Sequence, residues 1–427
     1  MEGQTELKKE LSLLEITLVG IGNILGAGIY VLMGKAAGLA GNMVWFSFLF
    51  AGITAALSAF SYMELSSMFP KAGAEYEFVK RAFGERVGLF TGLLVVYFVV
   101  ITSSAVALGF GRYFSSLFGT GGLIGAVFLF IGLSFLMVYG IKESARLAML
   151  IALVELFGLL IIIYIGLPYF GRVNYFESPG FAGVFEASTL IFFAFLGFED
   201  MVRLSQETKN AEKTTPKALL IAISFTVFLY ICVAISAVSV LDYQILGVSE
   251  VPLADVAAVA LGEDAFVLLS WIALLSTMNT VLVVMLGGSR IVYGMAHGGS
   301  LPAVFSKVHS KYNTPWAAIF GIASLSILFI LFRDIAVVAN IANFMIFLVF
   351  FMVNMSLIRL RYTSPEVKRP FRVPLSIGRL PLLPLLGAAA SVFLFSQLTL
   401  EVIIYGLFFA GIAVIIVFIR TRKVVLE

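Results

Sequence analysis

Glu155 is an ionisable residue that lies deep within a stretch otherwise free of charge. It follows Leu147 by eight residues, and if the stretch is helical this distance is roughly 12 Å along the helix axis. An apolar layer about 30 Å thick would then hold Glu155 near its middle. A functional role is the default interpretation of such a residue, because a charge at this depth costs roughly 2.5 kcal/mol or more.

Three roles fit Glu155. Burial disfavours the ionised carboxylate, which suits a residue that takes up and releases a proton. A carboxylate is equally a ligand for sodium, and hydroxyl groups further along the chain could complete such a site. The third role is structural, as an acid hydrogen-bonded to the first span. The predicted ion-coupling residues are Glu155, Ser276, Thr277 and Thr280.

Two other stretches are poorly suited to a continuous helix. The first is Gly22-Asn23-Ile24-Leu25-Gly26-Ala27-Gly28, whose glycines favour an unwound segment. The second is Phe193-Ala194-Phe195-Leu196-Gly197-Phe198-Glu199, which ends a run of uncharged residues too short to cross a membrane. A glycine-rich span can also reflect close helix packing, but a matched pair of interruptions indicates a transporter.

Each interruption frees backbone N–H and C=O groups at a depth where lipid cannot satisfy them. A zwitterion can satisfy both kinds. We expect its carboxylate on amides near Gly26, Ala27 and Gly28. Its ammonium group is expected on carbonyls near Gly22, Ile24, Phe193 and Leu196. The predicted substrate-binding residues are Gly22, Ile24, Gly26, Ala27, Gly28, Phe193, Ala194, Leu196 and Glu199.

Glu199 has two interpretations. It stands where the second half of the interrupted span should begin, so its carboxylate could cap free amides and meet the positive helix end. Alternatively it is a gate or proton-sensing group beside the substrate. Asp200 is expected to be a second acid in the same first turn.

The surrounding chain has the composition of a membrane protein. Of its 427 residues 61% are apolar and 12% charged, and long runs such as Ala218 to Leu241 hold no charge at all. These runs do not alternate polar and apolar residues as barrel strands do. The sequence therefore predicts an all-α membrane protein with 12 transmembrane helices and no separate soluble domain.

The basic residues give the orientation. With the N-terminus inside, nearly all of the 28 lysines and arginines, including Lys8 and Lys9, fall in cytoplasmic segments. The outer side keeps Lys35, Arg112, Arg172 and Arg333. We therefore expect a multi-pass protein of the cell membrane, plasma or inner, with both termini in the cytoplasm.

The two interruptions fall in spans one and six, which are corresponding positions in two halves of five spans each. Because five is odd, the halves have opposite orientation, as in transporters built from inverted repeats. The sequence predicts one transporter domain over residues 1–427. Its parts are a first inverted repeat at 11–168, a second at 183–361, and two additional C-terminal spans at 380–420.

At these positions the chain resembles the amino acid, polyamine and organocation transporter superfamily, which has the LeuT-type fold. The resemblance covers residues from about Leu11 to Ile419 and is collinear. Its motifs are Gly22-Asn23-Ile24-Leu25-Gly26-Ala27-Gly28-Ile29-Tyr30, Tyr62-Met63-Glu64-Leu65, Phe69-Pro70-Lys71-Ala72-Gly73-Ala74-Glu75-Tyr76, Phe192-Phe193-Ala194-Phe195-Leu196-Gly197-Phe198-Glu199, Glu207-Thr208-Lys209-Asn210 with Pro216, Ser289-Arg290, and Leu301-Pro302 with Phe305, Val308 and His309.

The resemblance implies secondary transport of amino acids or amines, with carboxylate bound at Gly26, Ala27 and Gly28 and with Phe193 gating or stacking over the substrate. Two departures matter. Family members often have an acid in the segment that reads Ala296-His297-Gly298-Gly299 in this chain. The cytoplasmic-gate role of that acid therefore has no corresponding residue here. Some relatives carry a lysine at the position of Glu155, where its ammonium substitutes for a coupling sodium ion, so the sign of the charge is reversed here.

The leading hypothesis is a proton-coupled symporter of neutral amino acids working by alternating access. An exchanger, a sodium-coupled or cationic amino acid transporter, and a non-transporting sensor are the alternatives. An enzyme is not expected, since no span holds a catalytic constellation or a metal-spaced set. The expected partners are a small-molecule amino acid, a proton or sodium ion and the lipid bilayer. We expect no cofactor, metal or nucleic acid, and a monomer.

Overall fold

A computed structural model describes residues 11–69, 74–203 and 208–426. Lys8, Lys9, residues 70–73 and Glu207, which belong to the charge pattern and motifs above, lie outside the described residues.

Helices make up nearly all of the described chain. The α-helices are α1 (Leu13–Ala40), α2 (Val44–Met68), α3 (Ala74–Phe83), α4 (Glu85–Phe118), α5 (Gly122–Tyr139), α6 (Ile141–Gly166), α7 (Phe181–Ile191), α8 (Phe198–Arg203), α9 (Ala211–Val240), α10 (Tyr243–Val248), α11 (Pro252–Leu261), α12 (Glu263–His297), α13 (Trp316–Phe329), α14 (Ile335–Thr363), α15 (Leu382–Ser396) and α16 (Leu400–Leu426). Short 3-10 turns are η1 (Gly41–Met43), η2 (Leu167–Tyr169), η3 (Phe192–Phe195), η5 (Ala303–Ser306) and η6 (Ile330–Phe332). Strands β1 (Ser376–Ile377) and β2 (Leu380–Pro381) form an antiparallel pair.

The first helix shows how local sequence sets these bounds. Ser12 precedes α1, and its hydroxyl accepts a hydrogen bond from the Glu15 amide while the Glu15 carboxylate accepts from the Ser12 amide. This reciprocal capping box satisfies two amides that have no partner within the helix. It fixes the start of the helix that carries the first interruption.

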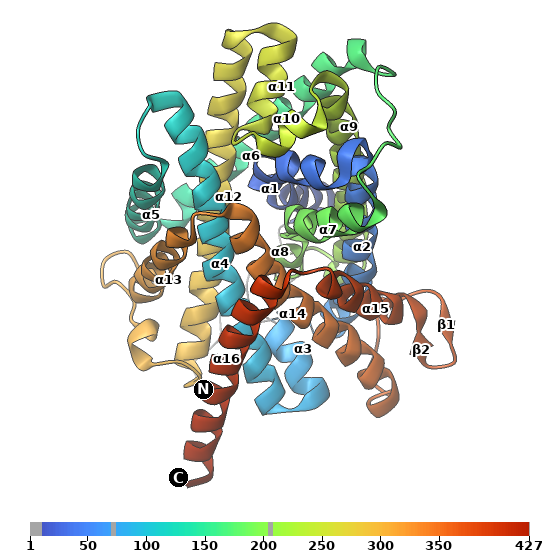
Figure 1. The fold of residues 1–427 in the computed structure, drawn as a ribbon. Coiled ribbons are helices and arrows are strands. Elements are labelled where there is room, and N and C mark those ends of the chain that lie inside the picture. The colour runs from blue at the N-terminus through green and yellow to red at the C-terminus, as the bar shows by residue number, and fades with distance from the viewer. Residues whose placement is uncertain (1–10, 70–73, 204–207, 427) are drawn as a thin grey trace.

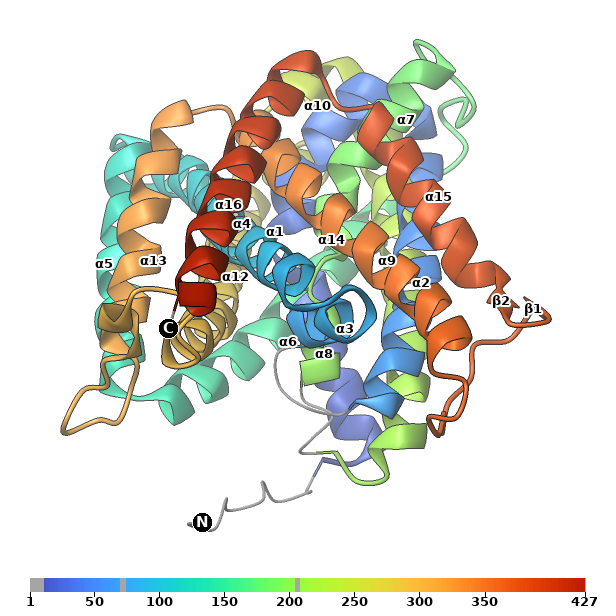
Figure 2. The ribbon, with the colours of Figure 1, turned by 90° about the horizontal axis from the view of Figure 1, so that it is seen from below.

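The helices form one bundle around α1. Helix α1 packs along α9 and α7, α4 packs along α12 and α14, and α2 packs along α9. Figures 1 and 2 show α5 and α13 together at one edge, and α15 with the β1–β2 hairpin at the opposite edge. In Figure 1 the end of α16, α3 and the hairpin lie toward one end of the bundle, while α10 and α11 lie at the other.

Nine helical stretches of the described chain are long and apolar enough to cross a membrane. One of them, Leu13–Met68, contains both α1 and α2, which η1 separates. The apolar stretches Trp316–Phe332 and Leu382–Ser396 are shorter. The protein is therefore a multi-pass helical membrane protein.

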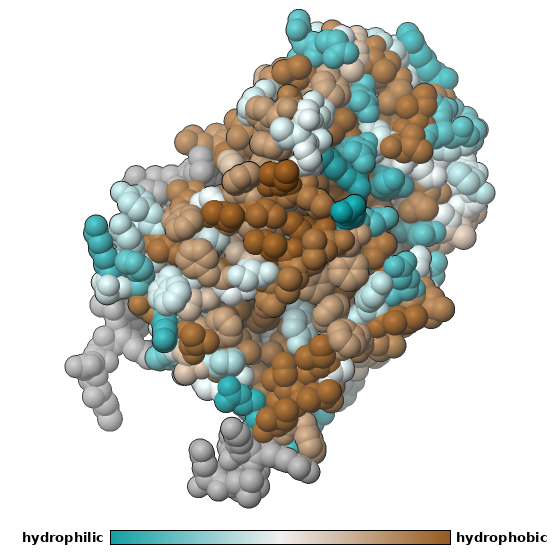
Figure 3. All heavy atoms as spheres, turned by 60° about the vertical axis from the view of Figure 1, so that its left-hand side comes forward, coloured by the Kyte–Doolittle hydropathy of each residue, from teal (hydrophilic) through white to brown (hydrophobic). Residues whose placement is uncertain are grey.

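The outer surface is apolar over a broad area. In Figure 3 hydrophobic residues cover the middle of one face, and hydrophilic residues gather toward its top and edges. On α5 the side chains of Phe128 and Phe135 are exposed. Large exposed phenylalanines suit contact with lipid chains.

A buried ion pair joins α2 to α14. The carboxylate of Glu64 is fully buried, and Arg361 Nε donates to its Oε1 at 3.0 Å. The amide of Val373 donates to its Oε2 at 2.7 Å, and Arg369 Nε lies 3.2 Å from Oε1. Two guanidinium groups and one amide therefore compensate the buried charge, and they tie the segment after α14 to the end of α2.

Candidate functional site

The first interruption lies within α1. Gly26 has φ 19° and ψ −172°, values that are not helical, and the helices on its two sides meet at this kink. The predicted interruption is confirmed, but it is narrower than the seven-residue unwound segment predicted. Residues 22–25 and 27–28 keep helical structure because one glycine absorbs the whole change of direction.

The second interruption separates α7 from α8, and it confirms the break predicted at Phe193 to Glu199. Helix α7 ends at Ile191, η3 tightens the chain over one turn, and Leu196 is extended with ψ 150°. Gly197 then has φ 114°, in a region that favours glycine, and α8 begins at Phe198.

The two interruptions are in contact. A β-carbon built on Gly28 would lie 2.5 Å from the α-carbon of Ala194, and one built on Gly197 would lie 2.6 Å from the carbonyl oxygen of Asn23. Only a residue without a side chain allows the backbones to approach this closely. The glycines therefore have two roles. They allow the backbone to change direction at each break, and they allow the two breaks to pack against each other.

Tyr230 of α9 connects the two breaks, and the sequence reasoning missed it. Its buried hydroxyl lies 2.9 Å from the carbonyl oxygen of Ile24, 2.6 Å from that of Leu25 and 3.3 Å from that of Ala194. These three oxygens share the one proton that the hydroxyl can donate. The carbonyl of Ile24, which we expected to face a substrate ammonium group, thus already has a partner. No local pattern distinguishes Tyr230 from the other aromatic residues of an apolar span.

Thr280 of α12 accepts a hydrogen bond from one of the backbone amides that were expected to bind a carboxylate. The amide of Ala27 donates to its hydroxyl oxygen at 2.8 Å, and this hydroxyl donates to the Ser276 carbonyl at 3.0 Å. Thr280 was predicted as an ion-coupling residue, and the structure places it directly on the first break. A ligand carboxylate at Ala27 would share or displace this hydrogen bond.

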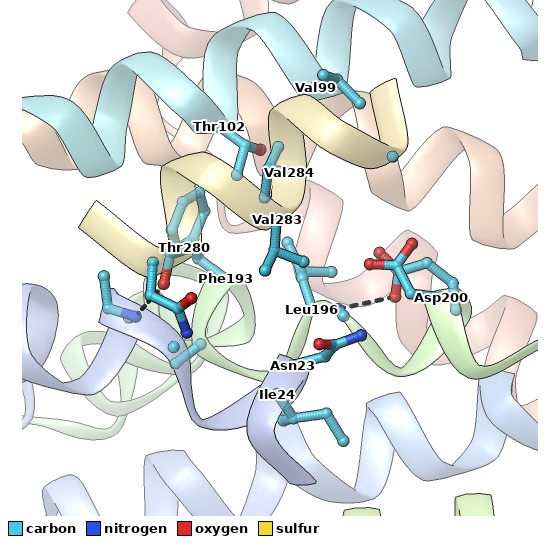
Figure 4. Close-up of a pocket in the computed structure, with 18 of the residues that line it drawn as sticks. Asn23, Ile24, Val99, Thr102, Phe193, Leu196, Asp200, Thr280, Val283 and Val284 are labelled. Carbon is cyan, nitrogen blue, oxygen red and sulfur yellow. Dashed lines mark hydrogen bonds between the residues drawn. The ribbon is translucent and has the colours of Figure 1, made fainter. Parts of the chain in front are cut away.

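A pocket opens beside the two breaks (Figure 4). All nine of the predicted substrate-binding residues line it. Figure 4 shows the lining side chains coming from α1, α4, α8 and α12, with Val283, Val284 and Leu196 pointing into the same space. The remaining lining residues are Asn23, Phe98, Val99, Thr102, Gly197, Asp200, Asn279, Thr280, Val283, Val284 and Gly287.

Glu199 lies in the first turn of α8 and is almost fully buried. Its Oε2 accepts a hydrogen bond from the Gly197 amide at 2.9 Å. This contact is the capping role that the sequence allowed for. Because Glu199 also lines the pocket, the capping role does not remove it from the site.

Glu155 of α6 is fully buried next to the pocket without lining it. Asn279 Nδ2 donates to Glu155 Oε1 at 3.0 Å, and Asn279 is itself a lining residue. The Tyr30 hydroxyl donates to the backbone carbonyl of Glu155 at 2.7 Å, so the first helix holds the backbone of Glu155 and α12 holds its carboxylate. A side-chain bond from Glu155 to the first span, one of the three expectations, is not among the contacts of the described residues.

The other two hydroxyls predicted at the ion site differ in their roles. Thr277 donates to the carbonyls of Ala273 and Leu274 in its own helix, so its hydroxyl is committed within α12. Ser276 lies beside the carboxylate of Glu155, on the same face of α12 as Asn279. Among the described residues, Ser276 Oγ and Glu155 Oε2 have no hydrogen-bond partner.

Comparison with known proteins places this chain in a family. Residues 11–423 match the family model described as amino acid permease. The chain belongs to the amino acid permease family. As a member it is a transporter of the amino acid, polyamine and organocation superfamily and not an enzyme, and the resemblance seen in its sequence is confirmed.

Two relatives of this permease from Bacillus subtilis cover nearly its whole length. It is 30% identical to the branched-chain amino acid permease BcaP of Bacillus subtilis, over 99% of this chain and 95% of that protein. It is 29% identical to the methylthioribose transporter of the same organism, over 98% and 94%. It is 28% identical to the vacuolar cationic amino acid transporter 4 of Arabidopsis thaliana, over 86% and 65%.

Proposed function

We propose that this permease carries neutral amino acids into the cell together with protons. One observation carries the proposal: a pocket built on two helix breaks is joined, through Asn279, to the buried acid Glu155. The breaks supply polar backbone groups for a zwitterion, and the acid supplies a group that can bind a proton.

The apolar part of the pocket favours a neutral substrate. Phe98 and Val99 of α4 and Val283 and Val284 of α12 line it, together with Phe193 of the second break. An aliphatic side chain placed against these groups would leave water for an apolar surface. The name of the Bacillus subtilis branched-chain amino acid permease agrees with such a substrate.

A cationic substrate is the second candidate. Two carboxyl groups, Glu199 and Asp200, line the pocket, and a relative is named as a cationic amino acid transporter. Glu199 already accepts the Gly197 amide, which reduces what it can offer to a ligand. Competition between a branched-chain amino acid and arginine for uptake distinguishes the two substrates.

For the coupling ion, the proton is favoured by the burial of Glu155 beside uncharged side chains of α12. Sodium is the alternative, because Glu155 Oε2, Ser276 Oγ and Asn279 Oδ1 are buried oxygens without a hydrogen-bond partner among the described residues. Oxygen atoms of this kind are the ligands that a hard cation prefers.

We further propose 12 transmembrane helices in one transporter domain, residues 1–427, with inverted repeats at 11–168 and 183–361 and two additional spans at 380–420. The interruptions in α1 and between α7 and α8 support this division, since each falls in the first span of its repeat. Alternating access would then move the two halves around the pocket.

We place this transporter in the cell membrane as a monomer with both termini in the cytoplasm. The distribution of lysine and arginine supports that orientation. Single cysteines introduced at residues of α11 and of the β1–β2 hairpin, in a Cys232→Ala background, test it. A membrane-impermeant thiol reagent would be applied to intact cells and to inside-out vesicles.

Uptake into proteoliposomes tests the function. The purified permease would be given radiolabelled leucine, arginine or methylthioribose under separately imposed proton and sodium gradients. Leucine uptake driven by an inward proton gradient supports the proposal. Uptake that needs sodium would replace the proposed proton symport with sodium symport. Uptake that occurs only against preloaded substrate would indicate exchange. If no substrate is taken up, a sensor is favoured.

A further inference from the structure

Asn279 belongs both to the pocket and to the surroundings of Glu155. Its side chain is 4% exposed, it lines the pocket, and its Nδ2 donates to Glu155 Oε1 at 3.0 Å. Its Oδ1 is buried and has no hydrogen-bond partner among the described residues. One end of the amide is therefore held by Glu155 while the other end is uncommitted.

A proton on Oε1, the Glu155 oxygen that faces Asn279, changes which end of the amide that oxygen can hold. An ionised carboxylate only accepts hydrogen bonds, so it requires the NH2 end of Asn279, as observed. A protonated carboxyl has an O–H to donate, and the carbonyl end of an amide is a better acceptor for it than an NH2 group. Protonation of Glu155 at Oε1 therefore favours rotation of the amide by a half turn, which releases the NH2 group.

We propose that this rotation of the Asn279 amide couples proton binding at Glu155 to substrate binding in the pocket. This inference rests on the proposed function, proton-coupled amino acid transport. When Glu155 is protonated, the Asn279 NH2 group is free to donate to the substrate carboxylate. When Glu155 is ionised, the same position offers a carbonyl oxygen, which repels a carboxylate.

The position of Asn279 along α12 supports a contact with the carboxylate. The next residue, Thr280, accepts the hydrogen bond of the Ala27 amide at the first break. Gly26, Ala27 and Gly28 are the residues where a carboxylate is expected, and all three line the pocket with Asn279. The side-chain amide of Asn279 therefore lies next to the position expected for the substrate carboxylate. Whether its NH2 group or its carbonyl oxygen faces that position would affect substrate binding.

No charged side chain of the described residues contacts the Glu155 carboxylate. Among the described residues, the titratable side chains that face it are the phenols of Tyr30 on α1 and Tyr230 on α9, and both donate to backbone carbonyls. Helix α12 presents the uncharged Asn279 and Ser276. Asp255 of α11 accepts a hydrogen bond from Ser249 instead.

The test measures leucine affinity of the full-length permease in liposomes at a series of pH values, for wild type, Asn279→Leu and Glu155→Gln. Wild type should bind leucine between about 5- and 150-fold more tightly at low pH than at high pH, the usual range for coupled sites. Asn279→Leu should bind weakly at every pH, with the pH dependence removed. Glu155→Gln should hold the affinity near its low-pH value.

Two further variants complete the design. Asn279→Ser, whose short hydroxyl cannot span the pocket and Glu155, replaces Asn279→Leu if the latter does not fold. Asn340→Leu is the matched control, because Asn340 of α14 is not among the residues that line the pocket, and its pH profile should equal that of wild type.

The outcomes separate this inference from the proposed function. If Asn279→Leu or Asn279→Ser keeps the wild-type pH dependence while Glu155→Gln loses it, proton coupling stands and the role of Asn279 is wrong. If wild type itself shows no pH dependence and no proton-driven uptake, the proposed function fails, and the inference fails with it.

Discussion

Gly28 and Ala194, which lie 166 positions apart in two different interrupted helices, touch each other through their backbones. A β-carbon added to Gly28 would be 2.5 Å from the Ala194 α-carbon and 2.6 Å from its β-carbon. The two breaks are therefore in direct contact, and any motion of the first break relative to the second would change this contact.

Gly28→Ala should separate the two breaks. The added methyl group meets backbone atoms that cannot rotate away, and overpacking of this kind costs typically 1–3 kcal/mol. We expect uptake to fall at least tenfold with a lower melting temperature. Gly132→Ala in α5 is the matched control, because a β-carbon there meets nothing within 4 Å, and it should transport normally. Normal uptake by Gly28→Ala would show that the contact is dispensable.

Tyr230→Phe should loosen the connection between the breaks. The change removes one hydroxyl and leaves the buried carbonyls of Leu25 and Ile24 without their donor, a loss of about 1–3 kcal/mol. We expect slower transport and a lower thermal unfolding midpoint in detergent. Tyr175→Phe, whose hydroxyl bonds Gly171 and Ser239 outside the pocket, should leave transport close to that of wild type. Equal transport rates in the two variants would argue against a special role for Tyr230.

Glu155→Gln should uncouple transport from the proton gradient. Glutamine has the shape of the protonated acid and cannot release a proton, so the variant should exchange substrate but not accumulate it. Counterflow and gradient-driven uptake in the same proteoliposomes measure the two activities. Accumulation by Glu155→Gln with the wild-type pH profile would eliminate Glu155 as the proton carrier.

Glu64→Gln should destabilise the helical bundle more than the neutralisation of any charged side chain on the surface. Arg361 and Arg369 would keep their buried charges without a carboxylate, and loss of one partner from such a pair costs about 3–5 kcal/mol. Glu77→Gln, which breaks an ion pair with Arg81 that is partly accessible to solvent, should change stability by less than about 1 kcal/mol. Thermal unfolding of both variants in one detergent gives the comparison.

The sequence predicted those features of the site that depend on local backbone preference. The kink at Gly26 and the break before Glu199 could be predicted because glycine spacing and short uncharged runs are local properties. The contacts that complete the site could not. Tyr230 meets Ile24 across 206 positions and Asn279 meets Glu155 across 124, and hydropathy does not encode such pairings.

The length of the first break shows the same limit. A run of three glycines within seven residues suggested a long unwound segment, but Thr280 and Tyr230 supply hydrogen-bond partners to Ala27 and Leu25 from neighbouring helices. These partners let the chain resume its helix immediately after Gly26. Tertiary contacts therefore determine how many residues of the segment unwind. The glycine content determines only where the helix is interrupted.

The ion pair between Glu64 and Arg361 also concerns how the protein is made. Arg361 follows Glu64 by 297 positions, so at about 5–20 residues per second a ribosome delivers it roughly 15–60 s later. During that interval the second helix holds an acid with no counter-ion from α14. Glu64 is four positions from Met68, the end of α2, or about 6 Å along the axis, close enough for water to hydrate it while it waits. An early helix thus acquires its final surroundings only after about 85% of the chain has been synthesised.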